Sequence, residues 1–431
     1  MTDILHILRE SDVIGRLEYD RGKDSLSLQY EDSWRFAAEG FPVSVSLPLE
    51  NGSHGDLAVA KFLQGLLPDN DAVLSAWGKR FQVSKNNPYD LIKHVGEDCA
   101  GGLQFVRPDR LDLILSGELD SLRELGDGEM ERRLTALKAQ TRSVPVQIDG
   151  RFSLAGAQAK DALHLKDGKW FVPGGAIPTT HILKPEPDDL NEHALHEHFC
   201  LRLVAEIGLP VARSEVLRVG GMKVLSVRRY DRLPASEDGK PVRVHQEDFC
   251  QALGHFPSEK YERDGGASVV EIANLLSRES SASEEDLSRF NMALALNWII
   301  YGSDAHSKNY SLIHAPGSYL RLAPLYDVAS YLPYDSNPKS TKRKLSMKIG
   351  GEYRLHRISR ESWRKYAEES GQDTAWVEVW VNLMIDKVQE KIDVVTAEIC
   401  HDWDSVFIRN LRDLLLARVE VCRKAMETQS C

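Results

Sequence analysis

The chain has 431 residues, of which 42% are hydrophobic and 28% are charged, and these values are typical of a globular protein. This length predicts two to three domains. The formal net charge of -11 argues against a protein whose main task is to coat nucleic acid, because binding to phosphates is driven by Lys and Arg.

The cysteines and the hydropathy pattern predict a soluble, cytoplasmic protein. The 6 cysteines form neither a C-x-x-C pair nor a spacing suited to zinc, so they are expected to be reduced thiols. Acidic residues lie within the first turns, where a signal peptide would have an apolar stretch. No apolar run approaches the roughly 20 residues that a membrane span needs.

Residues 1–108 are predicted to form a small α+β module. Val13–Tyr19 and Ser25–Tyr30 alternate between apolar and polar residues around a turn-forming segment, which predicts a β-hairpin. Val43–Leu47 alternates as well, as a strand does. Between Leu57 and Phe81 the apolar residues fall at helical spacing.

Residues 109–146 have helical periodicity and are expected to form a helical connector. Residues 147–236 are expected to form a small lobe of short strands, interrupted by one helix over about Asn191–Ile207 that stops at Gly208-Leu-Pro210. The strands are expected at 152–154, 162–165, 170–172, 181–184 and 223–227.

Residues 237–431 are predicted to be helical, with the two longest helices at Thr374–Ile399 and Val406–Thr428. The polar segment Asp335–Lys344 is expected to be a surface loop. In a protein kinase, too, a region of strands is followed along the chain by a mostly helical region. The predicted fold is therefore α+β: a two-lobed protein-kinase-like fold with a small β-rich lobe, a large all-helical C-terminal lobe and an added N-terminal α+β module.

Three polar residues occur at the spacing that phosphoryl transfer requires. Kinases use a catalytic-loop Asp, an Asn five residues later and a second Asp beyond the next strands, to orient the acceptor hydroxyl and to bind Mg²⁺. Here Asn309 lies five residues after Asp304, and Asp327 follows a strand-like segment. Each residue alone is more often a turn or cap residue. Their order, and the apolar helix Met292–Ile300 before them, favour a kinase site.

The upstream half supplies candidates for contacts with a nucleotide. Phe152–Lys160 is a small-residue loop that matches neither Walker A nor G-x-G-x-x-G, so its signal is weak. Lys184 ends an apolar strand, where it either binds a phosphate or extends to solvent. Glu197 on the following helix could pair with Lys184, although Glu192 is an alternative and both could be exposed residues.

Seven motifs follow one another along the chain: Ser153–Lys160, Thr180–Lys184, Val227–Arg232, His245–Asp248, Lys260–Gly266, Ser303–Ser311 and Pro324–Asp327. In this order they resemble the signatures of the HipA family of bacterial serine/threonine-kinase toxins, and the resemblance runs from about residue 10 to beyond residue 350.

This resemblance implies a role for each candidate site residue. Asp304 would be the catalytic aspartate, Asn309 and Asp327 the Mg²⁺ ligands, and Lys184 the lysine on the phosphates of ATP, with Glu197 supporting it. Arg228–Tyr230 would be the hinge that meets adenine. The further residues expected to contact ATP are Ala155, Gly156, Ala157, Gln158, Ala159, Lys160, Arg228, Arg229, Tyr230, His306, Lys308 and Tyr326.

The resemblance also implies regulation and partners. Ser153 would be autophosphorylated, which would expel its loop and switch the kinase off; alternatively it is an ordinary strand hydroxyl. The substrate would be an aminoacyl-tRNA synthetase, whose modification inhibits translation. A HipB-like helix-turn-helix antitoxin would neutralise the toxin and make most of the contact with DNA.

Two other functions are compatible with parts of the sequence. One is a transcriptional co-repressor or scaffold with a vestigial kinase site, which the intact set Asp304, Asn309 and Asp327 disfavours. The other is a small-molecule kinase, because such enzymes use similar Asp and Asn loops. The Ser153 loop and the N-terminal module favour the toxin kinase.

Overall fold

The computed structural model describes residues 2–140, 152–156, 158–188, 190–235, 239–335 and 342–427. The chain forms two compact units. Unit 1 comprises Met1–Pro185, Leu217–Ser258 and Leu312–Tyr319, and unit 2 comprises Glu186–Val216, Glu259–Ser311 and Leu320–Cys431. Within the described residues, no helix is both long enough and apolar enough to cross a bilayer.

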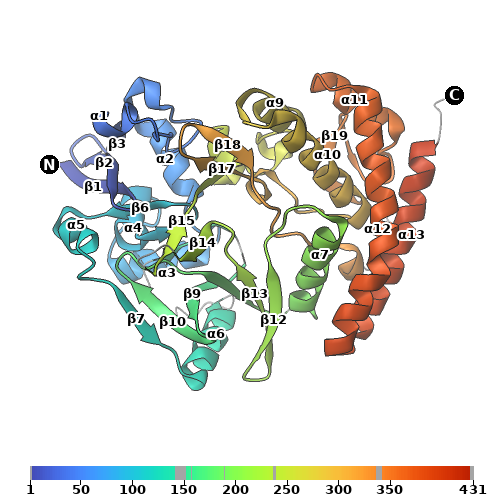
Figure 1. The fold of residues 1–431 in the computed structure, drawn as a ribbon, viewed down its shortest axis with the longest axis horizontal. Helices are drawn as coiled ribbons and strands as arrows, with labels where there is room; N and C mark the ends of the chain where they lie inside the picture. The colour runs from blue at the N-terminus through green and yellow to red at the C-terminus, as the bar shows by residue number, and fades with distance from the viewer. Residues whose placement is uncertain are drawn as a thin grey trace. The chain divides into compact units, whose positions relative to one another are not determined.

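The start of unit 1 is an α+β module built on a five-stranded sheet (Figure 1). Its strand order is β4 (Ser53–His54), β3 (Ser25–Tyr30), β2 (Asp12–Asp20), β1 (Thr2–Arg9), β6 (Leu103–Val106). The helices of this region are α1 (Asp32–Arg35), α2 (Asp56–Gly65), α3 (Asp71–Phe81), α4 (Pro88–Val95) and α5 (Pro108–Leu115). The predicted hairpin is confirmed, because Asp20 pairs with Ser25 across an antiparallel β2–β3 ladder.

The alternating segment Val43–Leu47 is not a strand, so this prediction was wrong. It is a turn closed by a bridge between Ser44 and Leu47. The Ser44 hydroxyl donates to the carboxylate of Glu247, and the backbone N–H of Val45 donates to the same carboxylate at 2.8 Å. The alternation therefore comes from a turn that buries Val43 and Leu47 and binds a buried acid.

A second sheet has six strands. Its order is β12 (Ser214–Val219), β13 (Met222–Arg228), β11 (His181–Pro185), β9 (Asp161–Lys166), β10 (Lys169–Gly174), β7 (Ser121–Glu124). Asp167 and Gly168 join β9 to β10 with φ of 50° and 75°, as a type I′ hairpin turn requires. Leu134, on helix α6 (Asp127–Gln140), packs against Leu163 and Leu183 of the sheet.

Strand β7 corrects the prediction of a helical connector over 109–146, of which residues 141–146 lie outside the described residues. Val172 of β10 pairs with Arg123, which places β7 at the edge of the second sheet. Leu122 is the only apolar residue of β7, and three of its four residues are exposed. An exposed edge strand lacks the alternating pattern by which strands are predicted.

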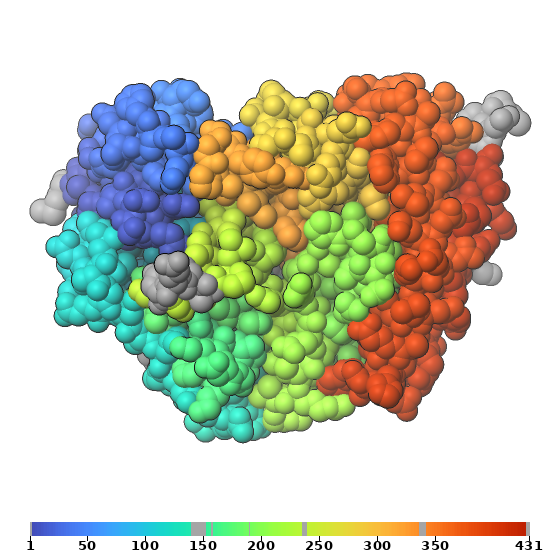
Figure 2. All heavy atoms as spheres, viewed as in Figure 1, coloured from blue at the N-terminus to red at the C-terminus, as the bar shows by residue number. Residues whose placement is uncertain are grey.

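Unit 2 is mostly helical. Its helices are α7 (His193–Ile207), α9 (Val269–Glu279), α10 (Ser283–Ile300), α11 (Arg360–Glu369), α12 (Thr374–Trp403) and α13 (Val406–Glu427). Helices α12 and α13 run side by side, and their side chains form a continuous surface in Figure 2. Both long helices were predicted within a few residues of their bounds, although Thr428 lies outside the described residues.

The C-terminal part was predicted to be all-helical, and this prediction was wrong. A hairpin of β19 (Lys344–Ile349) and β20 (Glu352–Arg354) lies within unit 2. The other short elements are β5 (Asp98–Cys99), β8 (Phe152–Ser153), β14 (Arg232–Ala235), β15 (Pro241–Arg243), β16 (His245–Asp248), α8 (Phe249–Ala252), β17 (Ser311–Ala315) and β18 (Tyr319–Leu322). Of the predicted loop over 335–344, residues 336–341 lie outside the described residues.

Candidate functional site

The loop that carries Asp304 begins where α10 ends. Tyr301 stops the helix with φ of 56°, and the N–H of Gly302 donates to the carbonyl of Asn297 at 2.8 Å. A Cβ at position 302 would lie 2.1 Å from Oδ1 of Asn297. The Asn297 amide is itself held, because it donates to the hydroxyl of Tyr310 at 2.8 Å. The exit from the helix therefore requires glycine.

The carboxylate of Asp304 is exposed on a tight loop. The N–H of His306 donates to the carbonyl of Asp304 at 2.8 Å, and the N–H of Asn309 donates to the carbonyl of His306 at 2.9 Å. Ser307–Asn309 forms a short 3-10 helix. His306 and Lys308 are 5% and 6% exposed, so these two predicted site residues are buried.

Asp327 is held in a conformation that few residues adopt. Its φ is 52°, in the left-handed region that Asp tolerates better than most other residues, and its side chain is exposed. On one side the N–H of Leu325 donates to the carbonyl of Pro210 at 2.9 Å. On the other side Ser330 donates to the carbonyl of Ile300 at 2.6 Å. A strained backbone fixed on both sides is common at functional sites.

A hydrogen bond through Tyr326 connects the two predicted magnesium ligands. The Tyr326 hydroxyl donates to the carbonyl of Lys308 at 2.8 Å. Asn309 follows Lys308 in the chain, and Asp327 follows Tyr326. This bond links the segment that carries Asn309 to the segment that carries Asp327, and Asp304 lies five residues before Asn309 in the first segment.

The donor set fits magnesium bound together with a nucleotide. Mg²⁺ is usually held by one or two protein carboxylates together with substrate phosphates and waters, and seldom by an all-protein cage. Across the described ranges, no group of three or more His, Cys, Asp or Glu residues could hold a metal ion. One carboxylate, Asp327, and one amide oxygen, Asn309, are what a metal shared with phosphates would require.

In unit 1 the predicted phosphate loop begins on a buried strand. Phe152 and Ser153 of β8 pair in parallel with Asp98 and Cys99 of β5. Ser153 is fully buried, and its hydroxyl donates to the carbonyl of Leu66 at 2.7 Å. In this conformation the Ser153 hydroxyl is not accessible as a phosphate acceptor.

The rest of the loop is closed by its own lysine. Lys160 Nζ donates to the carbonyl of Ala155 at 2.5 Å. Gly156 has φ of 108°, and a Cβ there would lie 2.4 Å from Lys160 Nζ, so this position requires glycine. Gln158 and Ala159 are half-buried beside it, whereas Ala157 lies outside the described residues.

Lys184 and Glu197 are both buried. Lys184 is 6% exposed on β11, opposite Leu225 of β13. Glu197 is 3% exposed on α7. Glu192, the alternative partner, accepts a hydrogen bond from Ser405 at 3.2 Å. The pairing of Lys184 with Glu197 stays a prediction.

The predicted hinge residues Arg228, Arg229 and Tyr230 differ in their surroundings. Arg228 is exposed, and the Tyr230 hydroxyl donates to the side chain of Gln246. The backbone N–H of Arg229 donates to the carbonyl of Thr180 at 2.9 Å. Of these three side chains, that of Arg229 is the most deeply buried.

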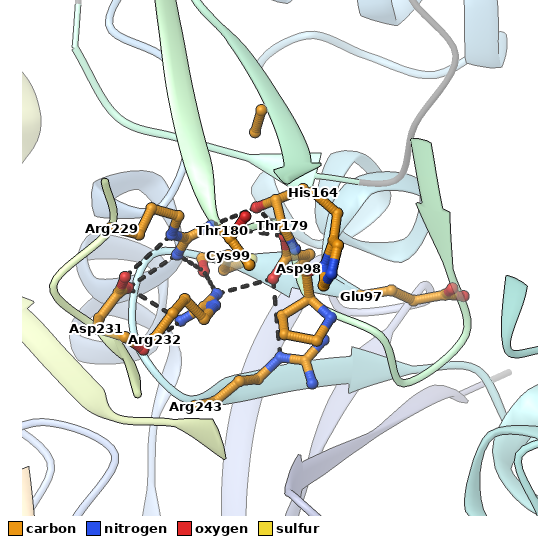
Figure 3. A network of polar contacts seen from close by, with 12 residues as sticks. Glu97, Asp98, Cys99, His164, Thr179, Thr180, Arg229, Asp231, Arg232 and Arg243 are labelled. Carbon is orange, nitrogen blue, oxygen red and sulfur yellow. Dashed lines mark hydrogen bonds and ion pairs between the residues drawn. The ribbon is translucent and has the colours of Figure 1, made fainter. Parts of the chain in front are cut away.

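Arg229 belongs to a buried ion-pair network within unit 1 (Figure 3). Its guanidinium forms two hydrogen bonds with Asp231, at 3.0 and 2.8 Å. Arg232 donates to Asp98 at 2.8 Å, and the Thr179 hydroxyl donates to Asp98 at 2.6 Å. Asp98 lies on β5 and Arg229 follows β13, so the network joins the N-terminal module to the region of the hinge. These contacts give the Arg229 side chain a structural role.

The arginines keep Asp98 charged although it is buried. Burial alone raises the pKa of the Asp98 carboxyl, but the nearby guanidinium groups of Arg232, Arg229 and Arg243 bring this pKa below its usual value. Burial raises the pKa of the adjacent Cys99 thiol to about 12. The Cys99 thiol is therefore neutral and unreactive at ordinary pH.

Two residues at the site were not predicted. The Tyr261 hydroxyl donates to Asp304 Oδ1 at 2.5 Å. Nε2 of His196 accepts from the N–H of Ser330 at 3.1 Å, and burial lowers the pKa of His196 to about 3, so this histidine is neutral. The run Lys260–Gly266 was recognised as a family motif, but nothing in its pattern assigns a role to Tyr261.

Comparison with known proteins identifies the family. The HipA N-terminal domain matches residues 5–106, and the HipA-like C-terminal domain matches residues 152–395. The chain belongs to the HipA family. The predicted resemblance is therefore confirmed, and this HipA family member is a protein kinase, as the sequence predicted.

Individual relatives match over nearly the whole chain. A putative kinase, Y4mE, of Sinorhizobium fredii is 32% identical over 97% of this chain and 98% of its own length. A serine/threonine-protein kinase toxin HipA of Shewanella oneidensis is 28% identical over 95% of this chain and 93% of its own length.

A solved structure shows the fold. HipA in the complex of Shewanella oneidensis HipA and HipB with operator DNA has a TM-score of 0.82 at 24% identity, over 99% of this chain and 100% of that chain. This likeness confirms the kinase-like fold predicted from the order of strands and helices.

Proposed function

We propose that this HipA family kinase transfers the γ-phosphate of ATP, bound with Mg²⁺, to serine or threonine hydroxyls of a protein. The observation that carries the proposal is the loop after α10, where Asp304 is exposed and a hydrogen bond from Tyr326 to Lys308 links the segment that carries Asn309 to the segment that carries Asp327. The family matches at 5–106 and 152–395 support an N-terminal module (1–108) that is separated by a connector (109–146) from the rest of the chain. We propose that the rest divides into a small lobe (147–236) and a C-terminal lobe (237–431).

The residues of the site divide the work of phosphoryl transfer. Asp304 accepts a hydrogen bond from the acceptor hydroxyl, orients it, and takes its proton late, as a new O–P bond forms and the bond to the leaving ADP breaks. Asn309 and Asp327 would supply oxygen ligands to the metal, and Lys184 would contact the phosphates. Mg²⁺, when bound, neutralises the charge that develops on the phosphate oxygens.

The first prediction is that phosphoryl transfer depends on magnesium through Asp327. Chelation of Mg²⁺ should abolish transfer from ATP, and added Mg²⁺ should restore it. Asp327→Asn should remain inactive at saturating Mg²⁺, because the amide removes the ligand charge. Asparagine is the informative substitution, because it tolerates the φ of 52° at this position and should not disturb the fold. Transfer that is unaffected by either treatment would contradict the proposed metal site.

We propose that phosphorylation of Ser153 switches the kinase off. The hydroxyl is buried against the carbonyl of Leu66, so β8 must separate from β5 before the serine can accept a phosphate. A phosphoserine carries nearly two negative charges, and returning it to a buried position that faces a carbonyl oxygen would be costly. Once modified, the loop would therefore stay out of the site.

The second prediction concerns where this phosphate is attached. After incubation with Mg-ATP, peptide mapping by mass spectrometry should locate a phosphate on Ser153. Ser153→Ala should lack it, and should fold because it loses one hydrogen bond worth about 1 kcal/mol. The variant should also stay active for longer than the wild type, because it cannot inactivate itself. A phosphate confined to other residues would contradict the assignment of Ser153.

We further propose that the chain is the toxin of a toxin–antitoxin pair in the cytoplasm. The Shewanella oneidensis relative is named a toxin, and the solved structure with the same fold is in a complex with HipB and DNA. A HipB-like helix-turn-helix antitoxin would neutralise the kinase. The net charge of -11 favours DNA contact through that partner. The proposed substrate is an aminoacyl-tRNA synthetase, whose phosphorylation would inhibit translation.

A further inference from the structure

The segment that precedes α9 packs onto the loop that carries Asp304. Both the N–H and the hydroxyl of Ser307 donate to the carbonyl of Lys260, at 3.3 and 2.9 Å. Gly266 allows this segment to fold tightly on itself, because a Cβ at that position would lie 1.7 Å from the carbonyl oxygen of Glu259. Both segments lie within unit 2, so Tyr261 is anchored to the loop that it contacts.

The side chain of Tyr261 is held on several sides. Its ring meets that of His306 edge to face, with centroids 5.0 Å apart. The guanidinium of Arg263 lies 4.9 Å from the centre of the same ring. The backbone carbonyl of Tyr261 accepts hydrogen bonds from the N–H groups of Asp264 and Gly266 at 2.9 and 3.1 Å. Tyr261 is thus a fixed group, whereas Asp304 is exposed and would otherwise rotate freely.

We propose that Tyr261 is a positioning residue for the catalytic aspartate. Its hydroxyl donates to Asp304 Oδ1 at 2.5 Å, which fixes the carboxylate and leaves Oδ2 to accept the hydrogen bond of the acceptor hydroxyl. This inference rests on the proposed role of Asp304. It adds a residue that acts through that carboxylate. Orientation of a reacting group contributes to the rate of the chemical step more than to binding.

The test is Tyr261→Phe, which keeps the ring on His306 and removes only the hydroxyl. The readout is self-phosphorylation followed by intact mass, with the rate constant measured at saturating Mg-ATP together with the ATP concentration that gives half that rate. A hydrogen bond to a charged group supports a loss of roughly tenfold in the rate constant. The half-saturating ATP concentration should stay within about twofold of that of the wild type. Tyr319→Phe, at an exposed tyrosine, is the matched control and should change neither quantity.

A double variant separates positioning from a general loss of structure. In an Asp304→Ala background, the hydroxyl of Tyr261 has no carboxylate to hold, so adding Tyr261→Phe should not lower the residual rate further. The same loss in both backgrounds would show that Tyr261 acts on the fold, and would overturn the proposal. A faster Tyr261→Phe enzyme would also overturn it, by showing that the hydroxyl blocks the place of the acceptor.

Failure of this inference can be told apart from failure of the proposed function. If Tyr261→Phe matches the wild type while Asp304→Ala is slower by about 10²-fold or more, Tyr261 has no positioning role and the kinase assignment stands. If the wild type transfers no phosphate, both the function and the inference fall.

Discussion

Asp304→Asn should lower the rate of phosphoryl transfer by about 10²- to 10⁴-fold, the range expected when a group that handles a proton in the transition state is removed. The amide can still accept a hydrogen bond, but it cannot take the proton of the acceptor hydroxyl. Asp304 is exposed on its loop, so the substitution should leave the stability of the fold nearly unchanged.

The measurement for this prediction is the rate of incorporation of labelled phosphate from ATP, together with the thermal unfolding temperature. Asp413→Asn is the matched control, because Asp413 is an exposed aspartate of α13 whose side chain is 67% exposed. The control should keep full activity. Asp304→Asn protein that folds normally and still transfers phosphate at the wild-type rate would remove Asp304 from the mechanism.

The second large effect is expected at Asp98. Asp98→Asn should reduce the free energy of unfolding of the wild type by about 3–5 kcal/mol, because it leaves the buried guanidinium groups of Arg229 and Arg232 without one of their partners. Chemical denaturation at neutral pH measures this directly. Asp109→Asn is the control: it removes an exposed carboxylate that is paired with Arg107, and such surface pairs contribute little.

The effect of Asp98 should depend on pH in a defined direction. Its folded pKa lies below the value of about 3.9 that an unfolded aspartate has, so the unfolded chain binds the proton first. The stabilisation is therefore complete above about pH 4 and is lost as the pH falls further. The difference between wild type and Asp98→Asn should shrink in acid. A difference that grows in acid, or a neutral-pH loss no larger than that of Asp109→Asn, would contradict the role assigned to the network.

The sequence could predict elements whose pattern is set by local packing. The hairpin of β2 and β3 and the long helices α12 and α13 bury one face, and a buried face leaves a periodic trace in the sequence. Helix α7 is buried over most of its surface, but its end is marked by the stop signal Gly208-Leu-Pro210. Strand β7 could not be predicted this way, because it is an exposed edge strand that forms by pairing with β10. Val43–Leu47 alternates for a different reason, since a turn there binds the distant residue Glu247.

For the candidate site, too, the sequence allowed some features to be predicted and not others. The spacing of Asp304, Asn309 and Asp327 follows from phosphoryl-transfer chemistry and can be seen in the chain. The contact of Tyr261 with Asp304 joins residues 43 positions apart and depends on how two loops fold against each other. The structural role of the Arg229 side chain was hidden for the same reason, because it depends on contacts with distant residues such as Asp98, which lies 131 positions away, as well as on the nearby Asp231. Long-range polar contacts leave no periodic signal.

The most direct test of the central claim is the intact mass of the purified chain before and after incubation with Mg-ATP, for the wild type and for Asp304→Asn. The mass before incubation must be read first, because phosphorylation in the expression host could hide the change. We predict that the wild type carries or gains phosphate and that Asp304→Asn carries none at either stage. Wild-type protein that is unmodified throughout, with no binding of ATP by calorimetry, would contradict the assignment of this site as a working kinase.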